Sequence, residues 1–279
     1  MQASDAPVLR DVVLLGGGHS HVVALRNFAM RPMPGIRLTL VCTDVMTPYS
    51  GMLPGYVAGH YSFEDVHIDL DRLAQFAGAR FIAAEAIGLD RSARRVLLRG
   101  RPALAYDRLS IDIGSTPGLD GVPGVQSFAT AVKPIAQFNR RWLGLLERVR
   151  THSGTSTIAV VGAGAGGVEL LLAMQYRLRK ELHATGRSIG EPEFHLFCAG
   201  GEVLPTHAPS VQRRFERVLR VRKVQVHVNA TVDEVAEGRL HSASTGWVDA
   251  DEIVWVTHAA GAAWLRETGL DLDESGFLR

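Results

Sequence analysis

The stretch Asp11-Val12-Val13-Leu14-Leu15-Gly16-Gly17-Gly18-His19-Ser20-His21 decides the fold. Four consecutive apolar residues lead into three glycines, and a segment with apolar residues at helical spacing follows. This order predicts a buried parallel strand, a tight turn and a helix. Such a turn brings backbone N–H groups and a helix N-terminus to one point, which suits a pyrophosphate.

A second copy of this pattern begins the second half of the chain, at Ile158-Ala159-Val160-Val161-Gly162-Ala163-Gly164-Ala165-Gly166-Gly167-Val168-Glu169. Here Gly162, Gly164 and Gly167 satisfy the complete G-x-G-x-x-G spacing. Two turns of this kind predict two bound dinucleotides. Two dinucleotides in one chain in turn predict electron transfer between them.

Composition narrows the class of protein. The 279 residues are 46% hydrophobic and 21% charged, which is globular and long enough for two domains. The net charge of +1 gives no reason to expect nucleic acid or an anionic membrane as the main partner. No apolar run approaches the ~18 residues of a transmembrane segment, and the N-terminus does not resemble a signal peptide. Cys42 and Cys198 lie far apart and predict two buried free thiols. We therefore expect a soluble protein of a reducing cytoplasm.

Hydrophobic periodicity predicts alternating strands and helices in both halves. The expected strands are 11–15, 36–41, 80–84, 95–98, 109–113, 193–198, 224–228 and 252–257, with a small antiparallel excursion at 232–236, 239–241 and 247–250. The expected helices are 20–30, 135–150, 211–222 and the segment that follows the second glycine turn. We expect a connector rich in glycine and proline at 119–124. We place the domain boundary at the polar segment 151–155.

The first turn departs from the dinucleotide pattern at two positions. Cys42 stands where an acid normally binds a ribose hydroxyl, and Asp44, two residues later, is the candidate in its place. His21 replaces the third glycine, so it must point away, shift the helix or place its imidazole near the phosphates; a packed or solvated histidine is the alternative. Histidines 19, 21, 60 and 67 have no cysteine or paired carboxylate at ligand spacing, so we predict no metal site.

Four further features are candidates for cofactor contacts. Residues 47–55 form a stiff loop or kinked helix that suits a flat aromatic ring, or else covers the core. Gly114 ends a strand, and a glycine there allows close approach of a cofactor. Glu169 either stabilises the start of the second helix or lies beside the reacting rings. Cys198 occupies the second ribose position, which leaves NADH and NADPH equally open.

These parts together resemble the two-dinucleotide-domain flavoproteins of the pyridine nucleotide-disulfide oxidoreductase superfamily. The resemblance is carried by Gly16-Gly17-Gly18, Ile111-Asp112-Ile113-Gly114-Ser115, Gly162 through Glu169, and Ile253 through Gly261. It implies an α/β fold of two three-layer Rossmann-like domains. The implied FAD-binding domain spans residues 1–150 and returns at 259–279, and an NAD(P)-binding domain is inserted at 151–258.

Within the superfamily, the chain resembles the type II NADH dehydrogenases more than the disulfide reductases, because it has no cysteine pair. Gly17 to His21, Thr47 to Gly55 and Val132 to Ile135 resemble the flavoprotein module associated with selenide, water dikinase. This implies that Gly16, Gly17, Gly18, His19, Ser20, His21, Asp44, Pro48, Gly114, Lys133 and Gly261 serve FAD, and that Gly162, Gly164, Gly167 and Glu169 serve NAD(P)H. An association with that kinase and a homodimer rest on the resemblance alone.

The chain ends at Phe277-Leu278-Arg279, before the Gly-Asp motif that closes the flavin site in the superfamily. We therefore expect a C-terminally truncated protein with weakened FAD binding. The predicted function is a FAD-dependent oxidoreductase in which Glu169 is the catalytic candidate and hydride passes from NAD(P)H to the flavin. A small-molecule acceptor, either a quinone or a selenium or sulfur compound, then takes the electrons. The alternatives are a truncated, non-catalytic dinucleotide-binding or interaction module and a sulfide:quinone oxidoreductase-like enzyme.

Overall fold

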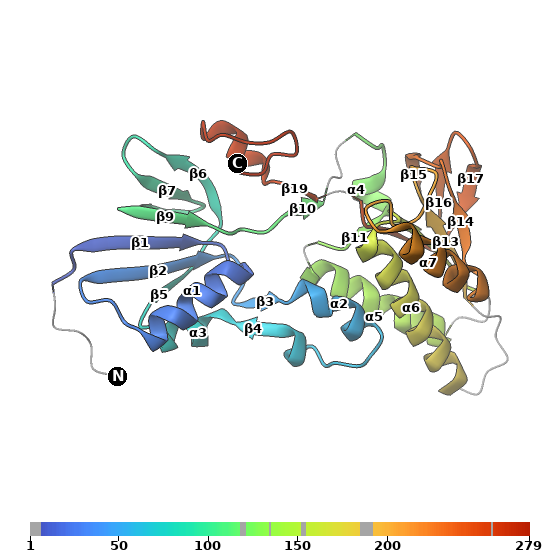
Figure 1. Ribbon diagram of the computed structural model, residues 1–279, viewed down its shortest axis with the longest axis horizontal. Helices are drawn as coiled ribbons and strands as arrows, with labels where there is room; N and C mark the ends of the chain where they lie inside the picture. The colour runs from blue at the N-terminus through green and yellow to red at the C-terminus, as the bar shows by residue number, and fades with distance from the viewer. Residues whose placement is uncertain (1–6, 118–120, 134, 152–154, 185–191, 258) are drawn as a thin grey trace. The chain divides into compact units, whose positions relative to one another are not determined.

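Figure 1 shows the computed structural model, which describes residues 7–117, 121–133, 135–151, 155–184, 192–257 and 259–279. The chain forms two compact units. Unit 1 consists of Met1–Ser50, Phe63–Thr116 and Ala260–Arg279, and unit 2 consists of Gly51–Ser62 and Pro117–Ala259. Each unit is built around its own parallel sheet, so the α/β class is confirmed.

The sheet of unit 1 has the strand order β5-β2-β1-β9, and all its neighbours are parallel. Its strands are β1 (Arg10–Leu15), β2 (Ile36–Cys42), β5 (Arg80–Ala83) and β9 (Arg108–Ile111). Helices α1 (His19–Met30) and α3 (Leu70–Phe76) cover one face, and the antiparallel strands β6 (Ala86–Asp90), β7 (Arg95–Leu98) and β8 (Arg101–Ala105) cover the other. Side chains alternate along β1, so Leu14 packs under the helices while Val13 and Leu15 pack under the antiparallel strands.

Smaller elements complete unit 1. Strands β3 (Met46–Pro48) and β4 (His67–Asp69) pair antiparallel, and the short helix η2 (Glu64–Val66) precedes β4. The last segment of the chain contains the short helix η3 (Ala263–Glu267), whose Trp264 packs onto the cluster under β7. Strand β1, near the start of the chain, and helix η3, near its end, therefore contribute to one core.

Unit 2 has a five-stranded parallel sheet in the order β11-β18-β12-β13-β14. Its strands are β11 (Thr130–Ala131), β12 (Thr157–Val161), β13 (Glu193–Phe197), β14 (Gln225–His227) and β18 (Glu252–Trp255). One face carries α2 (Leu53–Val57), α5 (Ile135–Thr151), α6 (Ala165–Ala184) and α7 (Pro209–Val221), and the other carries α4 (Val125–Phe128), β15 (Val232–Ala236), β16 (Arg239–Ser242) and β17 (Gly246–Asp249). The unit thus has three layers.

The two units repeat one plan. Each runs through a strand, a glycine turn, a helix, a second strand, a helix, a third strand, three antiparallel strands and a fourth strand that returns beside the first. Strand β12 of unit 2 therefore corresponds to β1, and β18 corresponds to β9. This correspondence allows the two glycine turns to be compared residue by residue.

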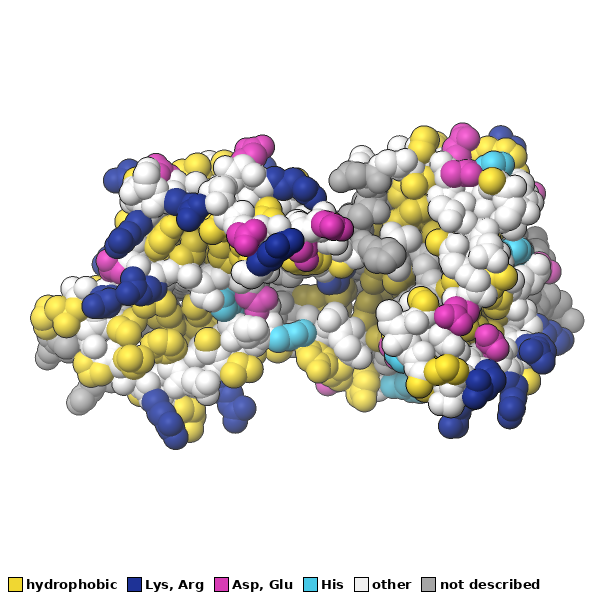
Figure 2. Space-filling view, turned by 45° about the horizontal axis from the view of Figure 1, so that its top comes forward, with side chains coloured by type: hydrophobic (Ala, Val, Ile, Leu, Met, Phe, Trp, Pro, Cys, Tyr) yellow, Lys and Arg dark blue, Asp and Glu magenta, His cyan; other side chains and the backbone are white. Residues whose placement is uncertain are grey.

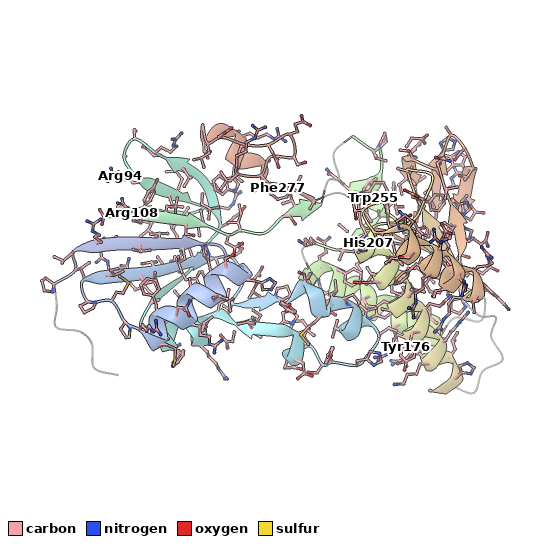
Figure 3. The ribbon with its side chains drawn as sticks, viewed as in Figure 1. Arg94, Arg108, Tyr176, His207, Trp255 and Phe277 are labelled. Atoms are coloured by element: carbon pink, nitrogen blue, oxygen red, sulfur yellow. The ribbon has the colours of Figure 1, made fainter. Side chains whose placement is uncertain are left out.

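The division of the chain differs from the predicted domains in two segments. Residues 117–150 were predicted in the first domain but lie in unit 2, because the apolar face of α5 packs against α6. Helix α2 also lies in unit 2, where Leu53 and Val57 are buried and Tyr176 of α6 contacts His60 with ring centroids 5.3 Å apart (Figure 3). The expected connector at 119–124 and boundary at 151–155 lie partly outside the described residues.

The surface carries charges of both signs, and on unit 2 Lys and Arg side chains gather at one end of the face shown in Figure 2. Helix α7 and the residues after it contribute exposed Arg213, Arg214, Arg217, Arg220, Arg222 and Lys223. Within the described part of the chain, no helix is long and apolar enough to cross a membrane.

Candidate functional site

The first glycine turn connects β1 to α1 and is held by backbone contacts. Gly16 has a φ of +100°, a conformation that glycine adopts without strain. Its N–H donates to the carbonyl of Val41 at 2.7 Å, and a Cβ on Gly16 would collide with the carbonyl of Asp112. Asp112 follows β9 and donates its own N–H to the carbonyl of Leu15 at 2.8 Å.

The second turn, between β12 and α6, repeats these contacts. Gly162 has a φ of +116°, and its N–H donates to the carbonyl of Phe197 at 3.0 Å. A Cβ on Gly162 would collide with the carbonyl of Val256, which donates its N–H to the carbonyl of Val161 at 2.8 Å. Val256 in unit 2 therefore occupies the position that Asp112 occupies in unit 1.

The two turns differ at the third position of the pattern. A Cβ on Gly167 would collide with the carbonyl of Gly162, which explains the glycine there. In the first turn His21 makes a hydrogen bond to the corresponding carbonyl: its Nδ1 donates to Gly16 at 2.7 Å, and its Nε2 lies 2.9 Å from the Oγ of Ser110. His21 is 1% exposed, so it neither points away nor reaches toward a phosphate, and the packed-histidine alternative holds.

The side chain of Asp112 lies at the N-terminus of α1, a contact that the sequence pattern did not predict. The carboxylate of Asp112 accepts the N–H of Ser20 at 3.0 Å, and its backbone carbonyl accepts the N–H of Gly18 at 3.0 Å. A Cβ on Gly18 would overlap this carboxylate. By contrast, no atom lies within 4 Å of a Cβ placed on Gly164 in the second turn. The first turn is therefore closed by an acid, and the second is open.

Comparison with known proteins now identifies the fold family. The family model described as "Pyridine nucleotide-disulphide oxidoreductase" matches residues 10–279, which include both glycine turns. The chain belongs to this family. The predicted superfamily is thereby confirmed.

Relatives of this chain are found among NADH dehydrogenase-like proteins. The NADH dehydrogenase-like protein YutJ of Bacillus subtilis is 23% identical over 276 residues, covering 96% of this chain and 70% of YutJ. Demethylphylloquinone reductase NdbB of Synechocystis is 22% identical over 210 residues, covering 73% of this chain and 50% of NdbB. The structure of NDH2 from Plasmodium falciparum in complex with NADH superposes with a TM-score of 0.80 at 17% identity, covering 93% of this chain and 57% of that one. The chain thus spans about half to two thirds of the length of most of these proteins.

FAD and NAD(P)H are the predicted cofactors, and solved structures of the same fold, NDH2 of Plasmodium falciparum and the water-forming NADH oxidase of Lactobacillus brevis, contain NADH. The second turn fits a dinucleotide, because Gly164 leaves open space at the start of a 20-residue helix. Gly200, after β13, likewise has no atom within 4 Å of a Cβ position. The residues of unit 2 therefore leave room for a nucleotide along the carboxyl ends of β12 and β13.

The residues of unit 1 fit FAD at three positions. Gly114 is exposed with a φ of +74° and has no atom within 4 Å of a Cβ position. Asp44 is exposed just beyond β2, where a ribose hydroxyl is expected. His19 is also exposed, and its ring meets that of Tyr49 edge-on at 4.7 Å. At Ser20, by contrast, the backbone N–H already donates to the carboxylate of Asp112.

Other predicted residues have structural roles in the same region. A Cβ on Gly17 would collide with Leu70, so this glycine permits packing of α3. Gly261 lies against the backbone of Gly276 and donates its N–H to the carbonyl of Ser275 at 2.9 Å. Pro48 lies on β3, whose neighbour Thr47 donates its hydroxyl to the carbonyl of Gly17 at 2.8 Å.

Two predicted residues lie in unit 2 near the starts of helices. Lys133 precedes α5, and Glu169 is exposed on α6. The first turn of α6 contains no acidic residue, because the helix begins at Ala165 and Glu169 is its fifth residue. Glu169 therefore lies one position beyond the first turn in which the sequence placed it. Its proposed contact with the nicotinamide stays a prediction.

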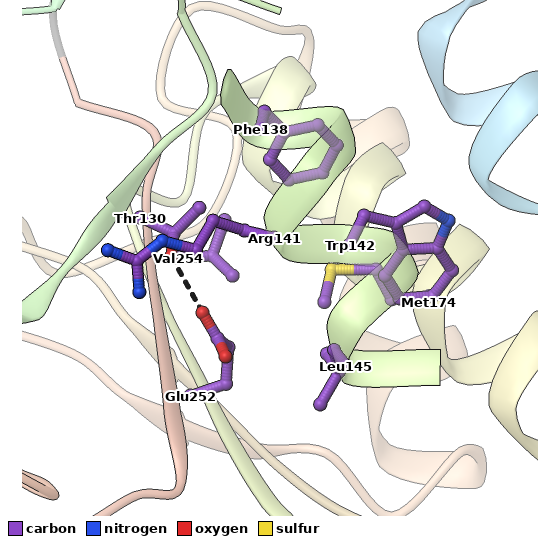
Figure 4. Close-up of a pocket in the computed structure, with 8 residues that line it drawn as sticks. All are labelled: Thr130, Phe138, Arg141, Trp142, Leu145, Met174, Glu252 and Val254. Carbon is purple, nitrogen blue, oxygen red and sulfur yellow. Dashed lines mark hydrogen bonds between the residues drawn. The ribbon is translucent and has the colours of Figure 1, made fainter. Parts of the chain in front are cut away.

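A buried carboxylate, Glu252, lies under α5 in unit 2. It accepts hydrogen bonds from the hydroxyl of Thr130 at 2.6 Å and from the guanidinium of Arg148 at 2.5 Å. The adjoining cavity, lined also by Arg141 and Trp142, has a volume of about 10 Å³ (Figure 4). This is room for one water and not for a nucleotide.

The two cysteines are free thiols, as predicted, but only Cys198 is buried as expected, whereas Cys42 is partly exposed. Cys198 is buried and its thiol lies 3.0 Å from the carbonyl of Glu202. Burial raises the pKa of the half-buried Cys42 thiol, which disfavours the reactive thiolate. Among the described residues, no three histidine, cysteine or acidic side chains are grouped so that they hold a metal ion.

Proposed function

We propose that this chain is a FAD-dependent oxidoreductase that passes hydride from NADH or NADPH to the flavin and then electrons to a small acceptor. The observation that carries this proposal is the twofold repetition of one strand–turn–helix arrangement, with Gly16 and Gly162 making the same backbone contacts in two separate sheets. One such turn serves one dinucleotide. Membership of an oxidoreductase family supports the assignment of FAD to unit 1 and NAD(P)H to unit 2.

The protein would contribute binding and orientation. In unit 1 the turn at 16–18, with Ser20, Pro48 and Gly114, would hold FAD, and Asp44 would bind its ribose. In unit 2 the glycines of the turn after β12 would hold the pyrophosphate of NAD(P)H. Glu169 would lie near the nicotinamide and Lys133 near the flavin. Bound FAD supplies the capacity to accept hydride and release electrons, so the residues need only position the reactants.

The proposed electron acceptor is a quinone or a selenium or sulfur compound. The sequence relative NdbB bears the name of a quinone reductase, which supports a quinone. The resemblance to the module associated with selenide, water dikinase supports a selenium or sulfur compound, and also an association with that kinase and a homodimer. The sulfide:quinone oxidoreductase-like alternative expects reactive cysteines, whereas Cys198 is buried and burial raises the pKa of Cys42.

A flavin spectrum tests the proposal. The purified chain is mixed with FAD and desalted, and its visible spectrum is recorded before and after NADH or NADPH is added without oxygen. We expect a flavin spectrum that bleaches with at least one nucleotide, which also identifies the donor. Flavin that is bound but bleached by neither nucleotide would refute the hydride pathway. Failure to bind FAD in a direct titration would refute the flavin site itself.

A further inference from the structure

The acid at the N-terminus of α1 has no counterpart in the second turn. Both turns share two equivalent backbone hydrogen bonds, yet Asp112 stands in unit 1 where Val256 stands in unit 2. The Asp112 side chain accepts the N–H of Ser20 at 3.0 Å, in the first turn of α1. Its carboxyl group also fills the space that a Cβ on Gly18 would take.

This N–H lies in the part of a dinucleotide turn that binds a pyrophosphate, because the first backbone donors of the helix have no intrahelical acceptor. A carboxylate and a phosphate compete for such a donor. They also repel each other, because both are negative. Both are stabilised by the same positive helix end, so they compete for it. A pyrophosphate at this turn must therefore displace the Asp112 side chain or bind beside its charge.

We propose that Asp112 is an internal competitor of the flavin pyrophosphate, which makes FAD binding by unit 1 weak and reversible. The inference rests on the proposed flavin site. It assigns to Asp112 control of cofactor affinity, while the same side chain stabilises α1 as a helix cap. One residue thus has opposite effects on the stability of the free protein and on its affinity for flavin.

The full chain offers a direct test by FAD titration, with flavin fluorescence as the measurement. Asp112→Asn removes the charge and keeps a capping oxygen, and Asp112→Val installs the residue found in the second turn. We expect both variants to bind FAD about tenfold more tightly than the wild type. The gain should shrink as salt is added, because ionic strength screens the repulsion that is lost.

The matched control is Asp107→Asn. Asp107 precedes the same strand, β9, and its carboxylate accepts the N–H of Asp11 at 2.7 Å, at the opposite end of β1 from the glycine turn. Asp107→Asn removes the same charge as Asp112→Asn, from a carboxylate that also accepts one backbone N–H. It does so away from the glycine turn, so we expect unchanged FAD affinity. A gain in affinity for this control equal to that for the Asp112 variants would overturn the inference.

Thermal unfolding without flavin provides the second measurement. The melting temperature should fall for Asp112→Val and fall less for Asp112→Asn, because the valine removes the helix cap altogether. Tighter FAD binding in a less stable protein is not a result of general unfolding. Equal FAD affinity in wild type and folded Asp112 variants would overturn the inference and leave the flavin site standing. Absence of FAD binding in all of them would refute both.

Discussion

Replacement of His21 by alanine should strongly destabilise unit 1. The imidazole is 1% exposed and connects the carbonyl of Gly16 to the hydroxyl of Ser110 at distances of 2.7 and 2.9 Å. Each hydrogen bond contributes about 1 kcal/mol, and the cavity left by the ring adds about 1 to 2 kcal/mol. We therefore expect His21→Ala to lower the free energy of unfolding of unit 1 by about 3 kcal/mol.

The assay must report on unit 1 alone. Amide hydrogen exchange, measured by mass spectrometry on peptides that cover β1 and α1, meets this need. Tryptophan fluorescence reports mainly on unit 2, which contains Trp142, Trp247 and Trp255. The matched control is His19→Ala, two residues earlier on the same helix, where the side chain is exposed. We expect this control to lie within about 0.5 kcal/mol of the wild type.

The result that would refute the reasoning is equal exchange in the His21 and His19 variants. A double-mutant cycle sharpens the test, because Ser110→Ala removes only the partner of Nε2. The coupling energy between His21 and Ser110 should be about 1 kcal/mol, whereas two independent side chains give a coupling energy near zero.

Three further predictions concern unit 2. Gly164→Val fills the open space at the start of α6, so it should weaken NADH binding at least about tenfold and spare FAD, and equal loss of both would contradict two separate sites. Glu169→Gln should slow flavin reduction by NADH about tenfold at an unchanged unfolding midpoint, because the side chain is exposed; an unchanged rate would leave Glu169 a surface charge. Burial, with repulsion from His227 as the second cause, lowers the pKa of His195 below 6.5, and burial lowers that of His227. The unfolded chain therefore binds more protons than the folded chain in mild acid, so the contribution of this neutral histidine pair to the stability of unit 2 should be fully present above about pH 6.5 and be lost as the pH falls below it. Urea unfolding measured from pH 5 to 7.5 gives the free energy of unfolding at each pH, and its slope against pH should be shallower for His227→Gln than for the wild type. An unchanged slope would exclude this histidine pair as the source of the pH dependence.

Most of the sheet architecture follows from local patterns in the sequence. Apolar residues alternate or run continuously in each predicted strand, and the predicted face of α5, from Phe138 to Val149, is buried as its helical spacing requires. The strands β6 and β8 were not predicted. Gly88 interrupts the first and Pro102 the second, and both residues weaken the strand pattern.

The decisive contacts of the candidate site could not be predicted in this way. Asp112 and Ser20 are 92 residues apart in sequence, and His21 and Ser110 are 89 apart. Periodicity reports which face of an element is buried, but it does not report which distant side chain meets the end of a helix. The quoted motif from Ile111 to Ser115 pointed to the right segment without indicating what its acid contacts.

The interleaving of the two units in the sequence separates helix α2 from its packing partner during biosynthesis. Helix α2 is made early, yet Leu53 and Val57 are buried in a cluster with α6, which begins more than a hundred residues later at Ala165. At about 5 to 20 residues per second, translation of the intervening chain takes on the order of ten seconds. During that time the ribosome presents an apolar helix without its packing partner. A translational pause between these segments prolongs the exposure of Leu53 and Val57 to other nascent chains, which favours aggregation.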